Sequence, residues 1–427
     1  MLSRLDLRAF TGDLRTALAP PPDEGEGPVA AVREIIAAVR ARGDDALREL
    51  TARYDGCEVG ELRVASAEVA AGLDRVPSAV RNALEYAAGE IRAYHETQLT
   101  PDTTWTRDGV VVQELVRPVE RVGCYAPGGR APLASTVLMT AIPARVAGVP
   151  EVIVCSPPDR DGRVPAPVLA AAAIAGVDDV YRVGGAQAIA AMAYGTASIT
   201  PVDVIVGPGN RYVALAKREV AGVVGIESLA GPSELVVIAD GTADARHVAL
   251  DLMAQAEHGP GGAAVLVAWD EGVVDAVEAA LVEEVARAAR RAEIESTLGS
   301  GGRAVLVDDA AGALAVSNTI APEHLQLMTA APEELLPGVR NAGAVFCGPW
   351  APAVVGDYVV GVNHVLPTAR TARYASALRV DDFRKHVHAV TLDRAALDRV
   401  APHVAALAGV EGLAAHAAAV AARGGGR

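Results

Sequence analysis

The stretch QAEHGP at residues 255–260 places an amide and an imidazole three positions apart, near the end of an expected helix. Side chains at positions i and i+3 lie on one helix face, so Gln255 and His258 can share a ligand. An imidazole, an amide oxygen and a carboxylate around zinc would leave the open position of a catalytic site. The alternative is a last-turn histidine that interacts with the helix dipole, ahead of Gly259 and Pro260. Spacing alone favours the alternative.

A second pair of chemically useful side chains lies in NTIAPEHLQLM, where Glu323 and His324 follow Pro322. Histidine transfers protons near neutral pH, and a half-buried glutamate can become a base. Successive residues of a strand point to opposite sides, so a shared acid–base role requires loop geometry. A helix N-terminus with a first-turn acid and a surface histidine explains the spacing better.

Two further stretches combine a carboxylate with an imidazole. GDYVVGVNHVLPT holds Asp357 and His364 in an irregular segment, and such loops on an α/β sheet often carry function. EGLAAHAAAV holds Glu411 and His416, which are five apart and share a face only if Glu411 begins the helix. A turn aspartate and a stray histidine on an amphipathic tail remain the simpler interpretations.

Two glycine-rich turns each follow an expected strand and open an expected helix: YAPGGRAPL (125–133) and GPGNRYV (207–213). Backbone N–H groups at such a turn can bind a phosphate. The dinucleotide fingerprint G-x-G-x-x-G is absent, because the nearest match, in GSGGRA, precedes a strand. Either turn alone is more often an ordinary βα connection. Both together favour a nucleotide crevice.

The elements that must position these residues alternate regularly. Helical patterns cover about 28–53 and 78–97, and strands such as EVIVCSP and VDVIVG then alternate with helices. A second series runs from ELVVIAD to AVFCG and includes a long helix at about 271–298. Such alternation predicts parallel sheets covered on both faces, in two similar doubly wound domains or in one large sheet. APPPDEGEGP (19–28) is an expected linker, and the alternation ends after residue 350.

Composition excludes several classes of protein. The 427-residue chain has a net charge of −15 and no basic cluster, which argues against nucleic acid as a partner. The scattered cysteines form no C-x-x-C pair, so neither a thiolate metal site nor a disulfide framework is expected. No signal peptide or membrane-spanning run is recognised, and a cytoplasmic protein is expected. The four cysteines are Cys57, Cys124, Cys155 and Cys347.

Taken together, the ordered segments resemble histidinol dehydrogenase. The resemblance covers about residues 28 to 423. It rests on GCYAPGGRAPLASTVLMTAIPARVAG, VGGAQAIAAMAYGT, VDVIVGPGN, AGPSE, AQAEHGP, NTIAPEHLQL, GDYVVGVNHVLPT and EGLAAH. The main departure is YASALRV (374–380), where relatives have a different local sequence, so the conformation of that loop is open.

The resemblance implies the last step of histidine biosynthesis. L-histidinol is oxidised to L-histidine in two successive NAD-dependent steps through bound histidinal, by a zinc-dependent homodimer. The implied fold is α/β, with two incomplete Rossmann-like domains, a helical N-terminal segment (1–27) and an extended helical C-terminal tail (376–427) that crosses to the partner subunit. The metal and substrate domain is expected at 28–120 and 230–375, and the NAD domain at 121–229.

Residue roles carry over from the same resemblance. The implied zinc ligands are Gln255, His258, Asp357 and His416, and the implied acid–base pair is Glu323 and His324. Besides these six, the implied substrate contacts are Ser233, His364 and Glu411. The implied NAD contacts are Tyr125, Gln187 and Asn210.

Two other functional classes compete with this interpretation. A zinc hydrolase with Glu323 as base would use the same ligands, but it leaves the two glycine-rich turns without a role. A non-catalytic α/β binding protein would account for the fold but not for the converging ligands. NADH release from L-histidinol, with and without a chelator, distinguishes the three.

Overall fold

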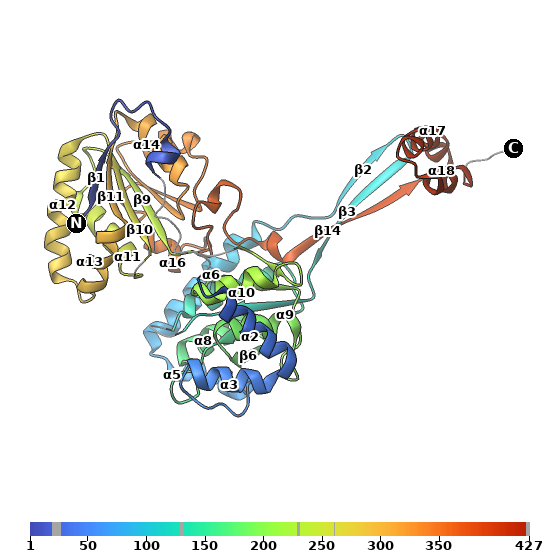
Figure 1. Ribbon diagram of the computed structural model, residues 1–427, viewed down its shortest axis with the longest axis horizontal. Coiled ribbons are helices and arrows are strands. Elements are labelled where there is room, and N and C mark those ends of the chain that lie inside the picture. The colour runs from blue at the N-terminus through green and yellow to red at the C-terminus, as the bar shows by residue number, and fades with distance from the viewer. Residues whose placement is uncertain (19–26, 129–131, 229–230, 260, 424–427) are drawn as a thin grey trace. The chain divides into compact units, whose positions relative to one another are not determined.

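The structure is a computed structural model that describes residues 1–18, 27–128, 132–228, 231–259 and 261–423. The chain forms two compact units. Unit 1 comprises residues 1–98 and 120–383, and unit 2 comprises residues 99–119 and 384–427. Helices and strands of both units are labelled in Figure 1. None of the described helices is both long enough and apolar enough to span a bilayer.

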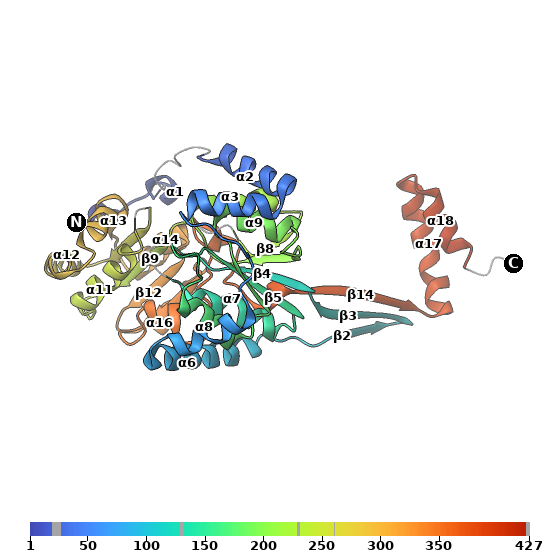
Figure 2. The same ribbon diagram turned by 90° about the horizontal axis from the view of Figure 1, so that it is seen from below.

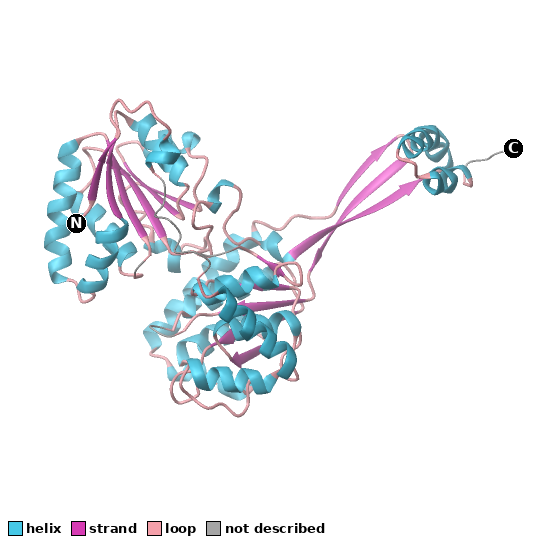
Figure 3. Cartoon of the chain, in the orientation of Figure 1, coloured by secondary structure: helices cyan, strands magenta, loops and turns pink. Residues whose placement is uncertain are grey.

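The larger sheet of unit 1, sheet A, has six parallel strands in the order β1-β11-β10-β9-β12-β13. Its strands are β1 (Ser3–Asp6), β9 (Glu234–Ala239), β10 (Ala263–Ala268), β11 (Gly302–Leu306), β12 (His324–Met328) and β13 (Ala344–Cys347). Alternate residues of β9 enter different cores: Leu235 and Val237 pack on one face, and Val236 and Ile238 on the other. Both faces are therefore apolar and covered by helices (Figure 3).

Helices α11 (Ala245–Ala256), α12 (Glu271–Arg287) and α13 (Arg291–Gly301) cover one face of sheet A. Helix α14 (Ala310–Ile320) and the short α1 (Leu14–Ala17) cover the other. Aspartates fix several helix starts. For example, Asp244 accepts hydrogen bonds from the N–H groups of Arg246 and His247, which satisfies two donors of the first turn of α11.

The second parallel sheet of unit 1, sheet B, has the strand order β6-β5-β4-β7-β8. The strands are β4 (Arg121–Tyr125), β5 (Glu151–Ser156), β6 (Asp179–Arg182), β7 (Val204–Val206) and β8 (Gly225–Ile226). Tyr125, Ile153 and Ile205 share a core with helices that precede the sheet in the chain and with helices that connect its strands. The helices around it are α2 (Val29–Arg42), α3 (Asp44–Tyr54), α4 (Ser66–Ala70), α5 (Gly72–Arg75), α6 (Ser78–Glu96), α7 (Ala134–Val146), α8 (Ala166–Ala175), α9 (Gly185–Tyr194) and α10 (Arg211–Val220).

Unit 2 is an antiparallel ribbon with a helix pair. Strands β2 (Thr103–Arg107), β3 (Val110–Pro118) and β14 (Arg384–Leu392) form a sheet with β3 in the centre. Helices α17 (Arg394–Val410) and α18 (Ala414–Ala421) follow β14 and pack on each other. Figures 1 and 2 both show the three strands side by side. Asp393 caps α17, and its N–H donates to the carbonyl of Gly109.

The expected α/β class with parallel sheets is confirmed, but several element assignments were wrong. The N-terminal segment begins with strand β1, paired with β11, because Leu2 and Leu7 can bury beside that edge strand. The C-terminal tail begins with strand β14, whose alternating pattern pairs with β3. Gly43, with φ of 54°, divides the helix expected over 28–53. The helix expected at 271–298 is two helices, and most of the 19–28 linker lies outside the described residues.

The domain boundaries also differ from the expected ones. Helices α2 and α3 share a core with sheet B, although residues 28–120 were expected to join the domain of sheet A. The apolar stripe of Val32, Ile35 and Val39 fits either sheet, so the sequence held no signal for this choice. Residues 376–383 remain in unit 1, and residues 99–119 join the tail strand in unit 2.

Candidate active site

The predicted acid–base and substrate residues of unit 1 gather at the amino-terminal edge of sheet A. Ser233 precedes β9, Glu323 precedes β12, and His324 is the first residue of β12. Strands β9 and β12 are neighbours, so these three residues lie side by side. Six predicted residues are linked in series by contacts: Gln255, Ser233, Glu323, His324, Asp357 and His364.

Glu323 is a buried carboxylate held by two donors. Its Oε2 accepts hydrogen bonds from the Ser233 hydroxyl and, at 3.0 Å, from the Glu234 N–H. The residue is 8% exposed, and burial raises the pKa of its carboxyl above the usual value. The surface location suggested by the spacing was therefore wrong: Glu323 stands at a strand start inside the protein.

His324 lies between two carboxylates. Its Nδ1 is 3.5 Å from Oε2 of Glu323, and its Nε2 is 3.7 Å from Oδ1 of Asp357. Nδ1 also lies 3.2 Å from the Glu234 carbonyl, which can only accept; in the neutral tautomer with its proton on Nδ1, Nε2 can take a proton. Burial alone would lower the pKa of His324, but the neighbouring carboxylates of Asp357 and Glu323 outweigh burial and raise it.

Gln255 and His258 occupy the end of α11, as the sequence predicted. His258 is exposed, and its Nδ1 lies 3.1 Å and 3.2 Å from the carbonyls of Ala254 and Gln255. The histidine thus binds the helix C-terminus and still leaves Nε2 for a ligand, so the two interpretations are compatible. The Nε2 atom of Gln255 is buried and has no hydrogen-bond partner among the described residues.

Asp357 and His364 lie on the irregular segment after β13. Asp357 belongs to the short helix α16 (Val354–Tyr358), and its carbonyl accepts from Nδ1 of His364 at 2.9 Å. The other ring nitrogen of His364 lies 3.3 Å from Oγ1 of Thr136 on α7. Burial lowers the pKa of His364, which favours the neutral ring.

One site residue was missed by the sequence reasoning. Glu234 follows Ser233, and its Oε1 accepts from the Ala369 N–H at 3.2 Å. Its Oε2 is buried without a hydrogen-bond partner within the described ranges. Burial and the charge of Glu323 raise the pKa of Glu234 to about 7. The signal was present in AGPSE, where an acidic residue begins a strand that is otherwise apolar.

The edge itself favours positive charge. Helices α11 and α14 end at this edge, because each precedes the amino end of the next strand of sheet A. A helix C-terminus carries about −0.5 of an elementary charge, so the helix ends and the nearby carboxylates favour a bound cation. A metal ion or a protonated amine fits this environment.

The predicted NAD contacts lie at the opposite, carboxyl-terminal edge of sheet B. Tyr125 ends β4, is buried, and accepts a hydrogen bond at its OH from the Gly185 N–H at 3.0 Å. Burial raises the pKa of Tyr125 to about 12. Gln187 is buried in the first turn of α9, and no described side chain caps that helix.

Asn210 differs from the expectation in one respect. Its Oδ1 caps α10 by accepting from the N–H groups of Tyr212 at 3.0 Å and Val213 at 3.1 Å. These two donors are therefore not free for a phosphate. Helices α9 and α10 both begin at this edge, where their positive ends favour an anion such as a pyrophosphate.

Glu411 and His416 are not brought to the cluster by contacts within unit 1, because both lie in unit 2. Glu411 follows α17, His416 lies on α18, and both are exposed. Within the described ranges, no group of three or more His, Cys, Asp or Glu side chains could hold a metal ion. Two of the four implied zinc ligands could not contribute to such a group within unit 1. Gln255 is not a His, Cys, Asp or Glu residue, and His416 lies in unit 2.

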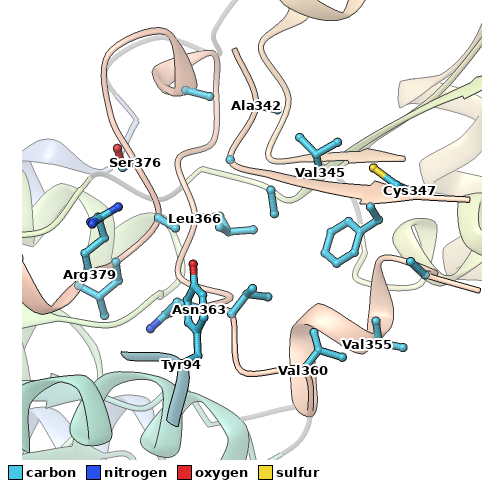
Figure 4. Close-up of a pocket in the computed structure, with 18 of the residues that line it drawn as sticks. Tyr94, Ala342, Val345, Cys347, Val355, Val360, Asn363, Leu366, Ser376 and Arg379 are labelled. Carbon is cyan, nitrogen blue, oxygen red and sulfur yellow. The ribbon is translucent and has the colours of Figure 1, made fainter. Parts of the chain in front are cut away.

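A cavity of about 820 Å³ lies beside edge strand β13 in unit 1. Phe346 from β13 and Val355, Val360 and Leu366 from the following segment line it (Figure 4). None of the sequence-predicted site residues is among its described lining residues. Trp350 also lines the cavity, and its side chain is 89% exposed. The cavity has a mixed lining of apolar side chains and of polar ones such as Asn363 and Arg379, and it lies at a sheet edge apart from the acid–base cluster.

Comparisons with known proteins agree over nearly the whole chain. The family model described as histidinol dehydrogenase matches residues 23–424. A histidinol dehydrogenase of Gluconobacter oxydans is 46% identical over 421 residues, covering 97% of this chain and 98% of the relative. One of Thermobifida fusca is 47% identical over 431 residues, covering 99% and 98%. A crystal structure of histidinol dehydrogenase from Elizabethkingia anophelis matches with a TM-score of 0.94 and 33% identity, covering 99% of this chain and 98% of that one.

Proposed function

The chain belongs to the histidinol dehydrogenase family, and from that membership we propose its reaction and the roles of its residues. It is an oxidoreductase of histidine biosynthesis. The proposed reaction oxidises L-histidinol to L-histidine in two successive NAD-dependent steps, with histidinal bound in between. NAD, when bound, supplies the hydride acceptor for each oxidation.

The observation that carries the proposal is the buried pair of Glu323 and His324, 3.5 Å apart at the cation-favouring edge of sheet A. Oxidation of an alcohol to an acid needs a base for the hydroxyl proton and a base for the water that hydrates the aldehyde. Two neighbouring bases, each held by separate partners, fit these two tasks.

His324 is proposed as the base of the first oxidation, with its neutral ring protonated on Nδ1 toward the Glu234 carbonyl and Nε2 available to take a proton. It takes the proton of the substrate hydroxyl as the carbon loses hydride. Glu323 is proposed as the base of the second, with Ser233 and the Glu234 N–H fixing its carboxylate. It takes a proton from water as the water oxygen adds to the aldehyde carbon, and the former aldehyde oxygen gains a proton to complete the gem-diol. The gem-diol then loses hydride to NAD and one hydroxyl proton to a base, which gives the carboxylic acid.

Gln255, His258, Asp357 and His416 are proposed to hold zinc. The donors of unit 1 fit such an ion: His258 has a free Nε2, Asp357 offers a carboxylate, and Gln255 offers its amide oxygen, which lies 3.5 Å from the Ser233 hydroxyl. Zinc, when bound, would act as a template that fixes the imidazole and amino nitrogens of the substrate. His364 and Glu411 complete the proposed substrate pocket.

A homodimer with exchange of the C-terminal tail is proposed as the assembly. Glu411 and His416 are exposed in unit 2, and the neighbouring Leu407 and Val410 are 68% and 90% exposed. Large apolar side chains in such positions mark a surface that becomes covered. The cavity beside β13, whose lining includes the exposed Trp350, is a second surface that we propose a second copy of the chain covers. Tyr125, Gln187 and Asn210 are proposed to bind NAD within each subunit.

The experiment that tests the function is NADH release from L-histidinol. Two NADH per histidinol are expected, with histidine as the product and no free aldehyde. A zinc chelator should abolish the reaction, and added zinc should restore it. Hydrolysis of an amide or ester without NADH would instead support a zinc hydrolase, and absence of both zinc and turnover would support a binding protein.

A further inference from the structure

A buried ion pair lies behind the proposed NAD contacts in the lobe of sheet B. Nζ of Lys217, on α10, is 2.6 Å from Oε2 of Glu227, which follows β8. The two side chains are 2% and 4% exposed. Lysine is almost never fully buried, and removing two charges from water costs several kcal/mol for each ion (order of magnitude). A pair of this kind needs a reason beyond stability.

Both members of the pair bind the backbone of one residue, Gly207. Oε1 of Glu227 accepts from the Gly207 N–H at 2.7 Å, and Nζ of Lys217 donates to the Gly207 carbonyl at 3.2 Å. The third side of Gly207 lies against β4, where an added Cβ would stand 2.2 Å from the carbonyl oxygen of Tyr125. Gly207 has φ of 116°, which only glycine adopts readily. The backbone of Gly207 is therefore held from three directions.

The held residue connects two of the proposed NAD contacts. Gly207 begins the GPGN turn that ends in Asn210, and its backbone rests on that of Tyr125. Asn210 cannot itself fix the turn, because its Oδ1 already caps α10. The position of the turn relative to β4 thus depends on the contacts of Gly207.

We propose that Lys217 and Glu227 are positioning residues that fix the 207–210 turn against Tyr125 in the geometry that NAD requires. The proposal rests on the proposed function, since it assumes that NAD binds at Tyr125 and Asn210. Neither side chain reaches the acid–base pair through any contact described above. Losing the ion pair should therefore weaken the interaction with NAD and leave the interaction with histidinol unchanged.

The test removes both charges together, because one charge left unpaired in the interior would destabilise the fold. The variant Lys217→Met/Glu227→Leu keeps similar side-chain volumes and leaves both backbone groups of Gly207 without partners. The KM for NAD should rise on the order of 10- to 100-fold, from the loss of two hydrogen bonds to the turn. The KM for histidinol should stay within about twofold. In Lys217→Met/Glu227→Gln the acceptor for the Gly207 N–H is retained, so part of the loss should be recovered.

Arg145→Met provides the matched control. Arg145 pairs with Asp178 at the amino-terminal edge of the same sheet, away from the turn, so its loss should leave the KM for NAD unchanged. Hydrogen exchange of the protein without NAD gives an independent readout. Amides of residues 207–213 should exchange on the order of 10-fold faster in the Met/Leu variant and at the wild-type rate in the control.

Three results would separate the possibilities. An unchanged KM for NAD with unchanged exchange would overturn the proposal. Equal rises in both KM values with a lower melting temperature would show a merely structural pair, and would also overturn it. If the wild-type protein reduces no NAD, the proposed function fails, and exchange at residues 207–213 alone decides whether the pair holds the turn.

Discussion

Replacing Glu323 with glutamine should separate the two oxidations. Glutamine is nearly isosteric, and its amide oxygen can accept the hydrogen bonds that Ser233 and the Glu234 N–H now donate to the carboxylate. The fold should therefore be retained while the base is lost. A positioned general base contributes about 10²- to 10⁴-fold to rate, or about 3–5 kcal/mol of barrier, so oxidation of supplied histidinal should fall by that factor.

The first oxidation should be much less affected. His324 keeps Asp357 at 3.7 Å and the Glu234 carbonyl at 3.2 Å, so only one of its three partners changes. We expect a loss of no more than about 10-fold, or about 1.4 kcal/mol of barrier. With histidinol as substrate, the variant should release one NADH per site quickly and the second slowly.

The assay compares initial NADH rates from supplied histidinal with the first-turnover NADH burst from histidinol. Glu333→Gln, at an exposed position on the short helix α15 (Pro332–Leu335), is the matched control and should change neither rate. Equal losses in both oxidations would refute the division of roles between Glu323 and His324. So would a larger loss in the first oxidation.

The other predictions concern metal content and stability. His416→Ala should lose zinc, measured by metal analysis of the purified protein, whereas His403→Ala on the neighbouring exposed face should keep it; retained zinc in His416→Ala would contradict the tail ligand. Burial raises the pKa of Asp55 to about 6, so the folded state holds this proton more tightly than the unfolded state, and folding stability falls as pH rises from about 4 to about 6. Discounted for solvent screening, Asp55→Asn should raise stability by about 1–2 kcal/mol at pH 7.5 and little at pH 4, seen as a melting-temperature gain at the higher pH only. Leu281→Ala should cost about 2–5 kcal/mol because the side chain is fully buried under sheet A, while Val282→Ala, 57% exposed, should cost under about 1 kcal/mol by denaturant unfolding.

Local patterns predicted the strands and helices of unit 1 well. ELVVIAD and EVIVCS are apolar runs bounded by polar residues, and each is a central parallel strand because both of its faces are buried. Asp244, directly before the apolar helical pattern, is the N-cap of α11, as the preference of aspartate for that position predicts. These features depend on neighbours in the chain, which the sequence displays directly.

Which residues meet in the candidate site depends on the order of the strands in the sheet, and the sequence does not reveal that order. Ser233 and Glu323 meet because β9 pairs with β12, two strands that are not consecutive. The site also lies at the amino-terminal edge of sheet A, whereas ligands of open α/β sheets usually bind at the carboxyl-terminal edge. The proposed zinc ion would account for that exception, since helix C-termini at the amino-terminal edge favour a cation. Only the resemblance to a known family identified the residues in advance.

Long-range pairing accounts for the remaining errors. Strand β1 pairs with β11, and Ser3 lies opposite Arg303. Helix propensity could not reveal this pairing, because the strand is stabilised by its partner. The same holds for Glu411 and His416, whose surroundings depend on a second subunit in the proposed dimer.

The construction of unit 2 has a consequence for synthesis of the protein. Strand β3 pairs with β2 at once, but its other edge waits for β14, so Pro118 must remain without its partner Arg384 until nearly the whole chain has left the ribosome. At ordinary elongation rates the delay is on the order of 10 to 50 s. During that interval the exposed edge of β3 can pair with another nascent chain, which is the hazard of any open strand edge. The charged residues Glu114 and Arg117 along β3 disfavour such pairing. If both charges were replaced, aggregation should appear first on polysomes, where several nascent chains lie close together.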